Sequence, residues 1–297
     1  MNSTLKTLKQ EGRCFLDEPM SKHTTWGVGG PATIFVLPKT TEQLVEIVGF
    51  CEDSGMRHIV IGNGSNLLFC DDGFCGVVIS TAKIEEQLVV RGTSVTAQAG
   101  TMLSSVAKAA YKNGLSGLEW AVGIPGTVGG GVVQNAGAFG REIGDVVSRV
   151  LTYEGRKLQT YPKSECQFAY RTSVFKNCDG IVLDACFVLK RDSQDAIKNR
   201  MKLCAARRML SQPTGKSAGS VFKSCGGFAA GYLIEKAGLK GQVCGGAQIS
   251  DKHANFIVNN GGATAQDIIN LIDETREKVH NIFGVWLETE IEIVKRN

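Results

Sequence analysis

Apolar and polar positions follow two different periods along this chain, and the changes of period predict strands alternating with helices. Short apolar runs at 33–38 and 58–61 are typical of strands. Between them, apolar positions from Leu44 to Cys51 recur with helical spacing, after Thr40, which stands where a helix N-cap is expected. This part of the chain therefore predicts a β-α-β unit.

The same alternation continues to the end of the chain. The further elements that it predicts are strands at 76–80, 87–92, 94–100, 156–162, 181–191, 254–259 and 285–294, and helices at 101–113, 192–208, 232–237 and 264–283. No segment repeats with a period of about 20 to 50 residues, which excludes a solenoid. We expect three successive parts, 1–80, 81–205 and 206–297.

Length and composition place the chain among globular proteins with about two domains. Its 297 residues are 43% hydrophobic, which is enough to bury a large core. The chain contains no apolar run of about 18 residues, and its first residues lack the apolar segment of a signal peptide. We therefore expect a cytoplasmic protein without a membrane partner.

Cysteines and histidines are too scattered to indicate a metal site. The ten cysteines include no C-x-x-C pair, and the four histidines have no metal-ligand spacing. In a chain without an export signal, reduced and mostly buried thiols are the expected state. We expect neither disulfides nor a bound metal.

The distribution of charge is more informative than its total. The net charge of +4 is too small to indicate a nucleic-acid partner, and no basic run is interleaved with aromatic residues. Residues 201–252, however, contain eight lysines and arginines against only two acidic residues, Glu235 and Asp251. A solvated basic face is one interpretation, and a site for a small anion in the last third of the chain is another.

Two glycine patterns are similar to nucleotide-binding motifs but fail on context. Residues 27–32 match G-x-G-x-x-A, yet Pro31 and the strand that follows leave no helix N-terminus for a pyrophosphate. Residues 213–220 contain Gly-Lys-Ser, but Leu210 stands where a P-loop has its first glycine, and no apolar strand precedes it. Neither pattern predicts a nucleotide site by itself.

Two other glycine-rich segments suit a phosphate ligand better. Residues 62–68 (GNGSNLL) follow a predicted strand and can present successive backbone N–H groups to an anion. Residues 123–140 contain seven glycines in eighteen positions, a density found where the backbone turns, packs closely or approaches a ligand. Two such cradles suit a ligand with a central diphosphate and two arms, as in a dinucleotide.

These segments belong to a set of six motifs. In chain order they are GNGSNLL at 62–68, GIPGTVGGGVVQNAGAFG at 123–140, YRTSVFK at 170–176, AGSVFK at 218–223, QVCGGAQISDKHANFIVN at 242–259 and LETE at 287–290. Together they resemble the UDP-N-acetylenolpyruvoylglucosamine reductase family, flavoenzymes that make UDP-N-acetylmuramate for peptidoglycan. The resemblance covers about residues 20–295. Because only 47 residues separate Arg171 from Gly219, too few for an extra lid loop, the chain resembles the shorter form of the family.

The resemblance implies an α+β chain with a vanillyl-alcohol-oxidase-type FAD-binding fold. Parts 1–80 and 81–205 would be two FAD-binding subdomains, and 206–297 a substrate-binding domain. The two glycine-rich segments would hold FAD without a covalent bond. The implied FAD-binding residues are Gly62, Asn63, Gly64, Ser65, Asn66, Leu67, Gly123, Pro125, Gly126, Gly129, Gly130, Asn135, Gly137 and Ala138.

The resemblance also implies three catalytic residues. Arg171 would hold the substrate carboxylate with its positive fork, although a surface arginine is the ordinary alternative. Ser220 would give a proton to the carbon next to the one that takes the hydride, although a loop serine often only caps a turn. Glu290 would lie beside the substrate carboxylate, and Glu288, on the same face of the predicted strand, is the residue most easily confused with it.

We assign Arg208, Lys223 and Lys252 to the anionic substrate, because a UDP-sugar with a carboxylate needs cations. A departure from the family pattern lies beside Lys223: Ser224-Cys225 follows GSVFK where Asn-Pro is usual. The family's substrate contact at that asparagine is therefore not carried over to this chain. Gly131, where alanine is more usual, is a milder departure.

These assignments predict an oxidoreductase with NADPH as hydride donor and a UDP-sugar as substrate, acting as a monomer without a nucleic-acid partner. One alternative is another FAD-dependent oxidoreductase of the same fold, such as a sugar or alcohol oxidase. Such enzymes often tether the flavin to histidine or cysteine, and no histidine lies in either glycine-rich segment. The other is a P-loop nucleotide-binding protein that uses residues 215–217, which predicts no flavin.

Overall fold

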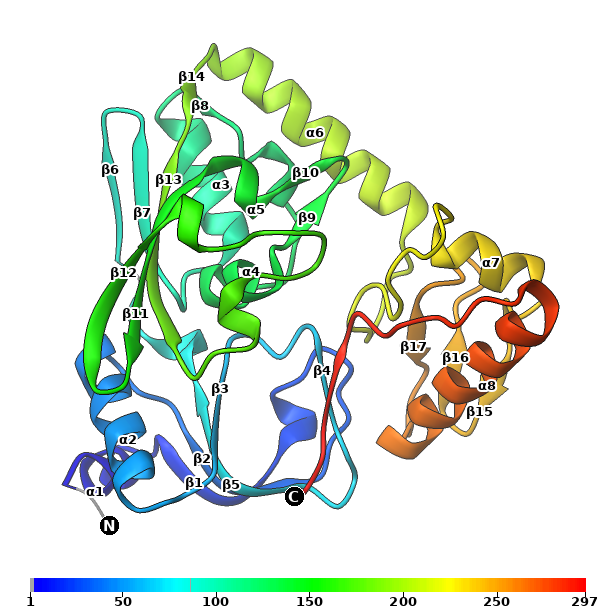
Figure 1. Cartoon of the computed structure of the whole chain (residues 1–297), viewed down its shortest axis with the longest axis horizontal. Coiled ribbons are helices and arrows are strands. Elements are labelled where there is room, and N and C mark those ends of the chain that lie inside the picture. Colours follow the sequence, from blue (N-terminus) through cyan, green and yellow to red (C-terminus); the bar gives the residue numbers. More distant parts are fainter. Residues whose placement is uncertain (1–2, 86) are drawn as a thin grey trace. The chain divides into compact units, whose positions relative to one another are not determined.

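The computed structural model describes residues 3–85 and 87–297. The helices are α1 (Ser3–Gln10), α2 (Thr41–Asp53), α3 (Leu103–Lys112), α4 (Val128–Gln134), α5 (Ile143–Val146), α6 (Gln194–Ser211), α7 (Ala230–Lys236) and α8 (Ala265–Phe283) (Figure 1). The strands are β1 (Cys14–Pro19), β2 (Pro31–Val36), β3 (His58–Ile61), β4 (Leu67–Phe69), β5 (Phe74–Ser80), β6 (Leu88–Arg91), β7 (Ser94–Gln98), β8 (Leu115–Ser116), β9 (Gly137–Ala138), β10 (Arg141–Glu142), β11 (Val147–Glu154), β12 (Lys157–Pro162), β13 (Ile181–Val188), β14 (Lys190–Arg191), β15 (Val243–Cys244), β16 (Ala247–Ile249), β17 (Ile257–Asn259) and β18 (Glu292–Val294).

Contacts between residues group the chain into two compact units, and neither unit is continuous in sequence. The first unit contains the chain up to Phe15, Phe35–Asn63 and Val78–Arg208, and the second contains Leu16–Ile34, Gly64–Val77 and Met209–Asn297. The division into 1–80, 81–205 and 206–297 stays a prediction.

The first unit is built on a five-stranded antiparallel sheet in the order β12-β11-β13-β7-β6 (Figure 1). Strand alternation gives this sheet two different faces: on β7, Val95 and Ala97 are fully buried, whereas Ser94 and Thr96 are half-buried on the other face. The apolar face packs against α3 and α4 in one hydrophobic core. Strand β11 has no counterpart among the predicted strands, because its buried positions do not alternate regularly.

The predicted β-α-β unit is present, but its strands are not neighbours. Helix α2 begins where predicted, with the Thr40 side chain accepting from the Gln43 N–H. In the four-stranded sheet β1-β2-β5-β3, strand β5 lies between β2 and β3. Strands β1, β2 and β5 each begin in one unit and end in the other, since the unit boundaries fall within them.

The second unit packs α7 and α8 around the small sheet β15-β16-β17. Helix α8 begins within a residue of the predicted start, and Thr264 and Asp267 form a capping box there. The predicted strand over 285–294 is wrong in length, because only Glu292–Val294 joins a ladder, parallel to β4. Within the described ranges 3–85 and 87–297, no helix is long and apolar enough to cross a membrane.

The glycine-rich segment 123–140 contains a helix that its composition does not predict. Three consecutive glycines lie inside α4, although glycine disfavours helix by about 1 kcal/mol per residue relative to alanine. Thr127 caps the helix by accepting from the Gly130 N–H, and Val128 and Val132 are fully buried. Capping and packing therefore offset the poor intrinsic propensity of the segment.

Candidate active site

The two glycine-rich segments meet within the first unit. The Asn63 side-chain amide donates to the Pro125 carbonyl at 2.8 Å. A Cβ added to Gly62 would lie 2.3 Å from the Thr127 hydroxyl oxygen, so glycine is required where the two segments touch. The prediction that these segments act together is consistent with this contact.

The glycines in and around α4 differ in the space available for a side chain. A Cβ at Gly129 would lie 2.9 Å from the Ala99 Cβ, one at Gly131 would lie 3.0 Å from a Leu103 methyl group, and one at Gly137 would lie 2.5 Å from the Arg141 carbonyl oxygen. These three glycines allow close packing of protein on protein. Gly130 differs, because it is exposed and the nearest neighbour of an added Cβ, the Thr127 hydroxyl, is 3.7 Å away.

Asn135 is fully buried, and protein groups engage its side chain at both ends. Its amide donates to the Ala169 carbonyl at 2.9 Å, and its carbonyl accepts from the Gly144 N–H at 2.9 Å. Its backbone is left-handed, with φ of 47°, which ends α4. Asn135 therefore ties the end of α4 to the loop that leads to Arg171, and it offers a ligand only its backbone.

Arg171 lies beside the second half of the glycine-rich segment. Its guanidinium donates to the Gly137 carbonyl at 3.3 Å and lies 5.2 Å from the ring centre of Tyr170. The residue is half-buried and has a φ of 56°, an uncommon conformation for a side chain of this size. This strained position fixes the guanidinium at β9, and backbone strain of this kind is frequent at functional sites.

Residues 64–67 of the first glycine-rich segment belong to the second unit, where other parts of the protein contact them. A Cβ at Gly64 would lie 2.1 Å from the His23 carbonyl oxygen. The Asn66 side chain donates to the Glu290 carbonyl at 3.1 Å, and the Asn66 carbonyl accepts from the Glu292 N–H at 2.9 Å. Ser65 is half-buried, and Leu67 begins β4. Asn66 thus positions the backbone of a predicted catalytic residue.

Ser220 and Glu290 are brought together in the second unit. The Glu290 N–H donates to the Val221 carbonyl at 2.7 Å, and Phe222 forms an isolated bridge with Thr289. Both Ser220 and Glu290 are half-buried. Two segments far apart in the sequence therefore place a hydroxyl-bearing and a carboxyl-bearing residue on adjacent extended chains.

Asn255 is a positioning residue that we did not predict. It is buried, its side chain accepts from the Phe222 N–H at 2.9 Å and donates to the Phe222 carbonyl at 2.8 Å, and its own carbonyl accepts from the Val221 N–H. These bonds fix the segment that follows Ser220. The signal in the sequence was an asparagine near the start of the predicted strand at 254–259, directly before the apolar residues 256–258.

The two neighbouring glutamates have different surroundings. The Glu288 carboxylate lies 3.2 Å from the Lys223 ammonium, and its side chain is 75% exposed. Lys223, predicted to bind substrate, is thus already paired with an acidic residue. Glu290 is the less exposed of the two glutamates.

The other two predicted substrate-binding cations fall in different units. Arg208 belongs to the first unit, where its side chain lies 3.3 Å from a Cβ built on Gly123 and its guanidinium lies 5.6 Å from the Phe139 ring centre. Burial lowers the pKa of this guanidinium. Lys252 is exposed in the second unit and donates to the Met209 carbonyl at 2.5 Å. Within the first unit, Arg208 therefore lies at the glycine-rich segment 123–140.

The first unit fits a flavin nucleotide along α4. Thr101 is 1% exposed, and among the described residues its hydroxyl has no hydrogen-bond partner. Its carbonyl accepts from the Val128 N–H at 2.8 Å, which places Thr101 behind the first turn of α4. The exposed Gly130 and the Asn63–Pro125 contact lie at the same turn. A ligand can approach the backbone there without meeting a side chain. Among residues 3–85 and 87–297, no group of three or more His, Cys, Asp or Glu side chains is placed to hold a metal ion.

Comparison with known proteins decides the family. An FAD binding domain model matches residues 32–155, and a model of the UDP-N-acetylenolpyruvoylglucosamine reductase C-terminal domain matches residues 211–294. A curated UDP-N-acetylenolpyruvoylglucosamine reductase from Caldanaerobacter subterraneus is 41% identical over 98% of this chain and 96% of its own length. The chain belongs to this reductase family.

Further relatives agree with this assignment. The Carboxydothermus hydrogenoformans reductase is 44% identical over 94% of this chain and 93% of its own length. The crystal structure of UDP-N-acetylenolpyruvylglucosamine reductase from Thermus caldophilus superposes with a TM-score of 0.80 and 35% identity, covering 95% of this chain and 98% of that one. The predicted α+β fold with an FAD-binding part and a separate C-terminal domain is confirmed. The protein is an FAD-dependent oxidoreductase.

Proposed function

We propose that this protein reduces the enolpyruvyl group of UDP-N-acetylenolpyruvoylglucosamine to give UDP-N-acetylmuramate, with NADPH as the hydride donor. The observation that carries the proposal is the pairing of the Ser220 and Glu290 segments through the 2.7 Å bond from the Glu290 N–H to the Val221 carbonyl. This pairing supplies a proton donor and a carboxylate on adjacent chains in a member of the reductase family.

FAD, when bound, supplies the redox chemistry by accepting hydride from the nicotinamide and passing it to the vinyl carbon of the substrate. In the first unit, Asn63, Pro125, Thr127 and Gly130 would hold the cofactor along the first turn of α4. The open face of Gly130 permits close approach, and the glycines packed against protein keep the helix in place.

Ser220 would give its proton to the carbon next to the one that receives hydride. A serine hydroxyl is a weak acid, so it transfers a proton efficiently only to a strongly basic carbon of the kind that hydride addition to a vinyl ether leaves. Asn255 and the bond to Glu290 hold the backbone at Val221 and Phe222, directly after Ser220, which limits the motion of this segment before substrate binds.

Arg171 and Glu290 would act on the substrate carboxylate. The guanidinium forms a positive fork suited to a carboxylate, and its anchor on the Gly137 carbonyl limits its motion. Glu290 would hydrogen-bond the substrate carboxylate and stabilise the charge that develops on it. Lys223, Lys252 and Arg208 stay proposed contacts for the anionic substrate. The monomeric state, the cytoplasmic location and the absence of membrane and nucleic-acid partners stay predictions.

The experiment that tests the proposal uses the Ser220→Ala enzyme, with Ser224→Ala as the matched control. Ser224 is an exposed serine four residues further along the same segment. Anaerobic NADPH should bleach the flavin absorbance of wild type and both variants at similar rates. Addition of the enolpyruvyl substrate should restore the absorbance in wild type and Ser224→Ala, but about 100-fold or more slowly in Ser220→Ala.

Two results would contradict the proposal, and they are distinguishable. Recovery of Ser220→Ala at the wild-type rate would exclude serine as the proton donor but keep the reaction. Failure of the wild-type enzyme to recover with this substrate, while oxygen restores the absorbance, would exclude the substrate and favour another FAD-dependent oxidoreductase of the same fold.

A further inference from the structure

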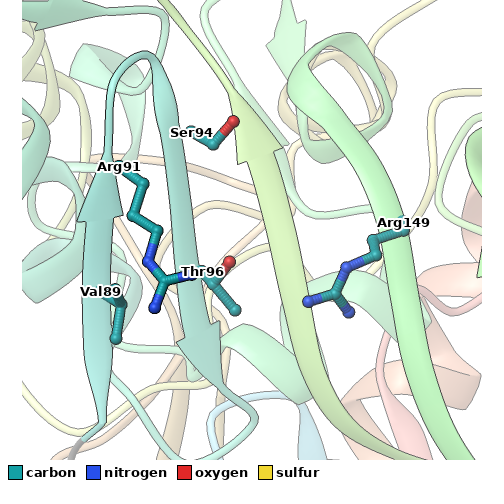
Figure 2. Close-up of a pocket in the computed structure, with 5 residues that line it drawn as sticks. All are labelled: Val89, Arg91, Ser94, Thr96 and Arg149. Atoms are coloured by element: carbon teal, nitrogen blue, oxygen red, sulfur yellow. The ribbon is translucent and has the colours of Figure 1, made fainter.

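The five-stranded sheet of the first unit has a hollow on the face opposite to α3 and α4. Val95 and Ala97 of β7 point into the core, so their neighbours Ser94 and Thr96 point to the other side. A cavity of about 270 Å³ lies there. Its lining residues are Val89, Arg91, Ser94, Thr96 and Arg149 (Figure 2). This cavity is separate from the glycine-rich cradle, which lies on the α4 side of the sheet.

Strand register brings the lining residues into one row across four strands. Thr96 pairs with Val89 on β6 and with Cys186 on β13, and Cys186 pairs with Arg149 on β11. Three strand spacings of about 4.8 Å therefore separate the backbones of the outer members of the row. Arg91 lies two pairs further along β6, on the same face, opposite Ser94.

The two arginine side chains extend toward each other over the intervening strands. Figure 2 shows the Arg91 guanidinium beside Thr96 and the Arg149 guanidinium extending from β11 over β13. The arrangement therefore places two arginines, a serine and a threonine around one hollow.

The charges in this hollow are not balanced. Arg149 lies 2.9 Å from the Asp184 carboxylate, which holds its guanidinium in place. Among residues 3–85 and 87–297, Arg91 forms no ion pair with an acidic residue, and no acidic side chain lines the cavity. Asp184 pairs with Arg149 alone, so the Arg91 guanidinium carries the positive charge that is left for a ligand.

We propose that this hollow binds a small anion that bears a phosphate or diphosphate group. The guanidinium fork matches two phosphate oxygens, and the Ser94 and Thr96 hydroxyls can donate to others. Arg149 is oriented in advance by Asp184, which reduces the entropy lost on binding. The volume lies below the range of about 300–1,000 Å³ that holds drug-sized ligands, so it suits a diphosphate group rather than a whole dinucleotide.

Two other ligand classes fit this hollow less well. Nucleic acid requires an extended basic surface with several phosphate contacts, whereas only two cations line this cavity. A carboxylate offers two oxygens and one charge, fewer acceptors than the two guanidinium groups and two hydroxyls can serve. A diphosphate has enough oxygens to engage all four groups.

The test titrates pyrophosphate into the FAD-loaded enzyme by isothermal calorimetry. The variant is Arg91→Gln, and the control is Arg191→Gln, an exposed arginine on β14 outside the cavity. We expect saturable binding to wild type and to Arg191→Gln, and a dissociation constant at least about tenfold higher for Arg91→Gln, because a charge-assisted contact is lost. Thr96→Val, which keeps both arginines, should weaken binding by a smaller factor.

Three results would overturn the proposal. The first is the absence of binding to wild type at millimolar pyrophosphate. The second is equal binding by Arg91→Gln and wild type, which would place the anion at another site. The third is binding of succinate as tight as that of pyrophosphate, which would exclude a preference for phosphate. Flavin absorbance and the melting temperature of each variant confirm that the variants are folded.

Discussion

At the scale of single residues, Glu288 and Glu290 lie two positions apart but have different environments. Glu288 is 75% exposed and forms an ion pair with Lys223, whereas Glu290 is half-buried and its backbone is held on both sides, by Val221 and Asn66. An exposed ion pair contributes about 0–1 kcal/mol, so Glu288 is replaceable. A carboxyl group held in place beside Ser220 is suited to act on bound substrate.

This contrast gives the first prediction. Glu290→Ala should slow the recovery of flavin absorbance by the enolpyruvyl substrate by about 100-fold, since the hydrogen-bonding group aimed at developing charge is lost. Glu288→Ala should change that rate by less than about threefold. Stopped-flow absorbance after anaerobic reduction measures both rates, and the reduction by NADPH serves as the internal control. The reverse order of the two effects would assign the catalytic role to Glu288.

At the scale of elements, α4 contains both glycines that pack against the protein and one glycine that is accessible to a ligand. Gly129 packs against Ala99, and its N–H donates to the Ala99 carbonyl at 2.9 Å, which attaches α4 to the end of β7. Gly130, the next residue, is exposed and has space for a methyl group. Adjacent residues of the same type therefore serve stability and ligand access.

The second prediction uses these two glycines as a matched pair. Gly129→Ala should lower the free energy of unfolding of the apoenzyme by roughly 1–3 kcal/mol, because its Cβ would lie 2.9 Å from the Ala99 Cβ. Gly130→Ala should leave the apoenzyme as stable or raise its stability by up to about 1 kcal/mol, since alanine favours helix.

Cofactor binding should respond to the change at Gly130. Gly130→Ala should raise the dissociation constant of FAD, because the added methyl group occupies the space where the ligand approaches the backbone. Urea unfolding of the apoenzyme and FAD titration by flavin fluorescence separate the two effects. Unchanged FAD affinity in Gly130→Ala would exclude close approach of the cofactor at this turn of the helix.

At the scale of the whole molecule, all ten cysteines are free thiols, distributed over both units. Burial, together with the nearby Glu52, raises the pKa of Cys51 to about 11, and burial with the nearby Glu165 raises that of Cys166 to about 11. Cys75 is exposed. Because the thiolate is the reactive form, the buried thiols are expected to be inert near neutral pH.

The third prediction follows from these surroundings. Iodoacetamide at about pH 8 should modify Cys75 in the native protein much faster than Cys51 and Cys166. Cys75 should be fully modified while the two buried thiols are still unmodified. Peptide mapping by mass spectrometry measures the extent at each position, and labelling in urea, where all three should react, is the control. The melting temperature should not change on addition of dithiothreitol. A drop with reductant would indicate a disulfide.

The sequence alone determined the features that depend on contiguous residues. The spacing of apolar positions predicted α2 and α8 within a residue or two, and Thr40 predicted the start of α2, because helix formation and capping are local. The ordered motifs predicted the family, the cofactor and the FAD-binding region. A motif can predict a family and its cofactor because it combines particular residue types at fixed spacing along the chain.

Only the tertiary structure decided which of these residues share a surface. Most of the predicted strand at 285–294 does not join a sheet. Its backbone instead forms single contacts with Val221 and Phe222, in the segment that follows Ser220. The glycines of 123–140 divide into packed and open positions according to neighbours such as Ala99, which lies outside that segment. Arg91 and Arg149 line one hollow because strand register aligns β6 and β11 across two intervening strands. Contacts of this kind depend on residues far apart in the chain, and local sequence patterns do not encode their partners.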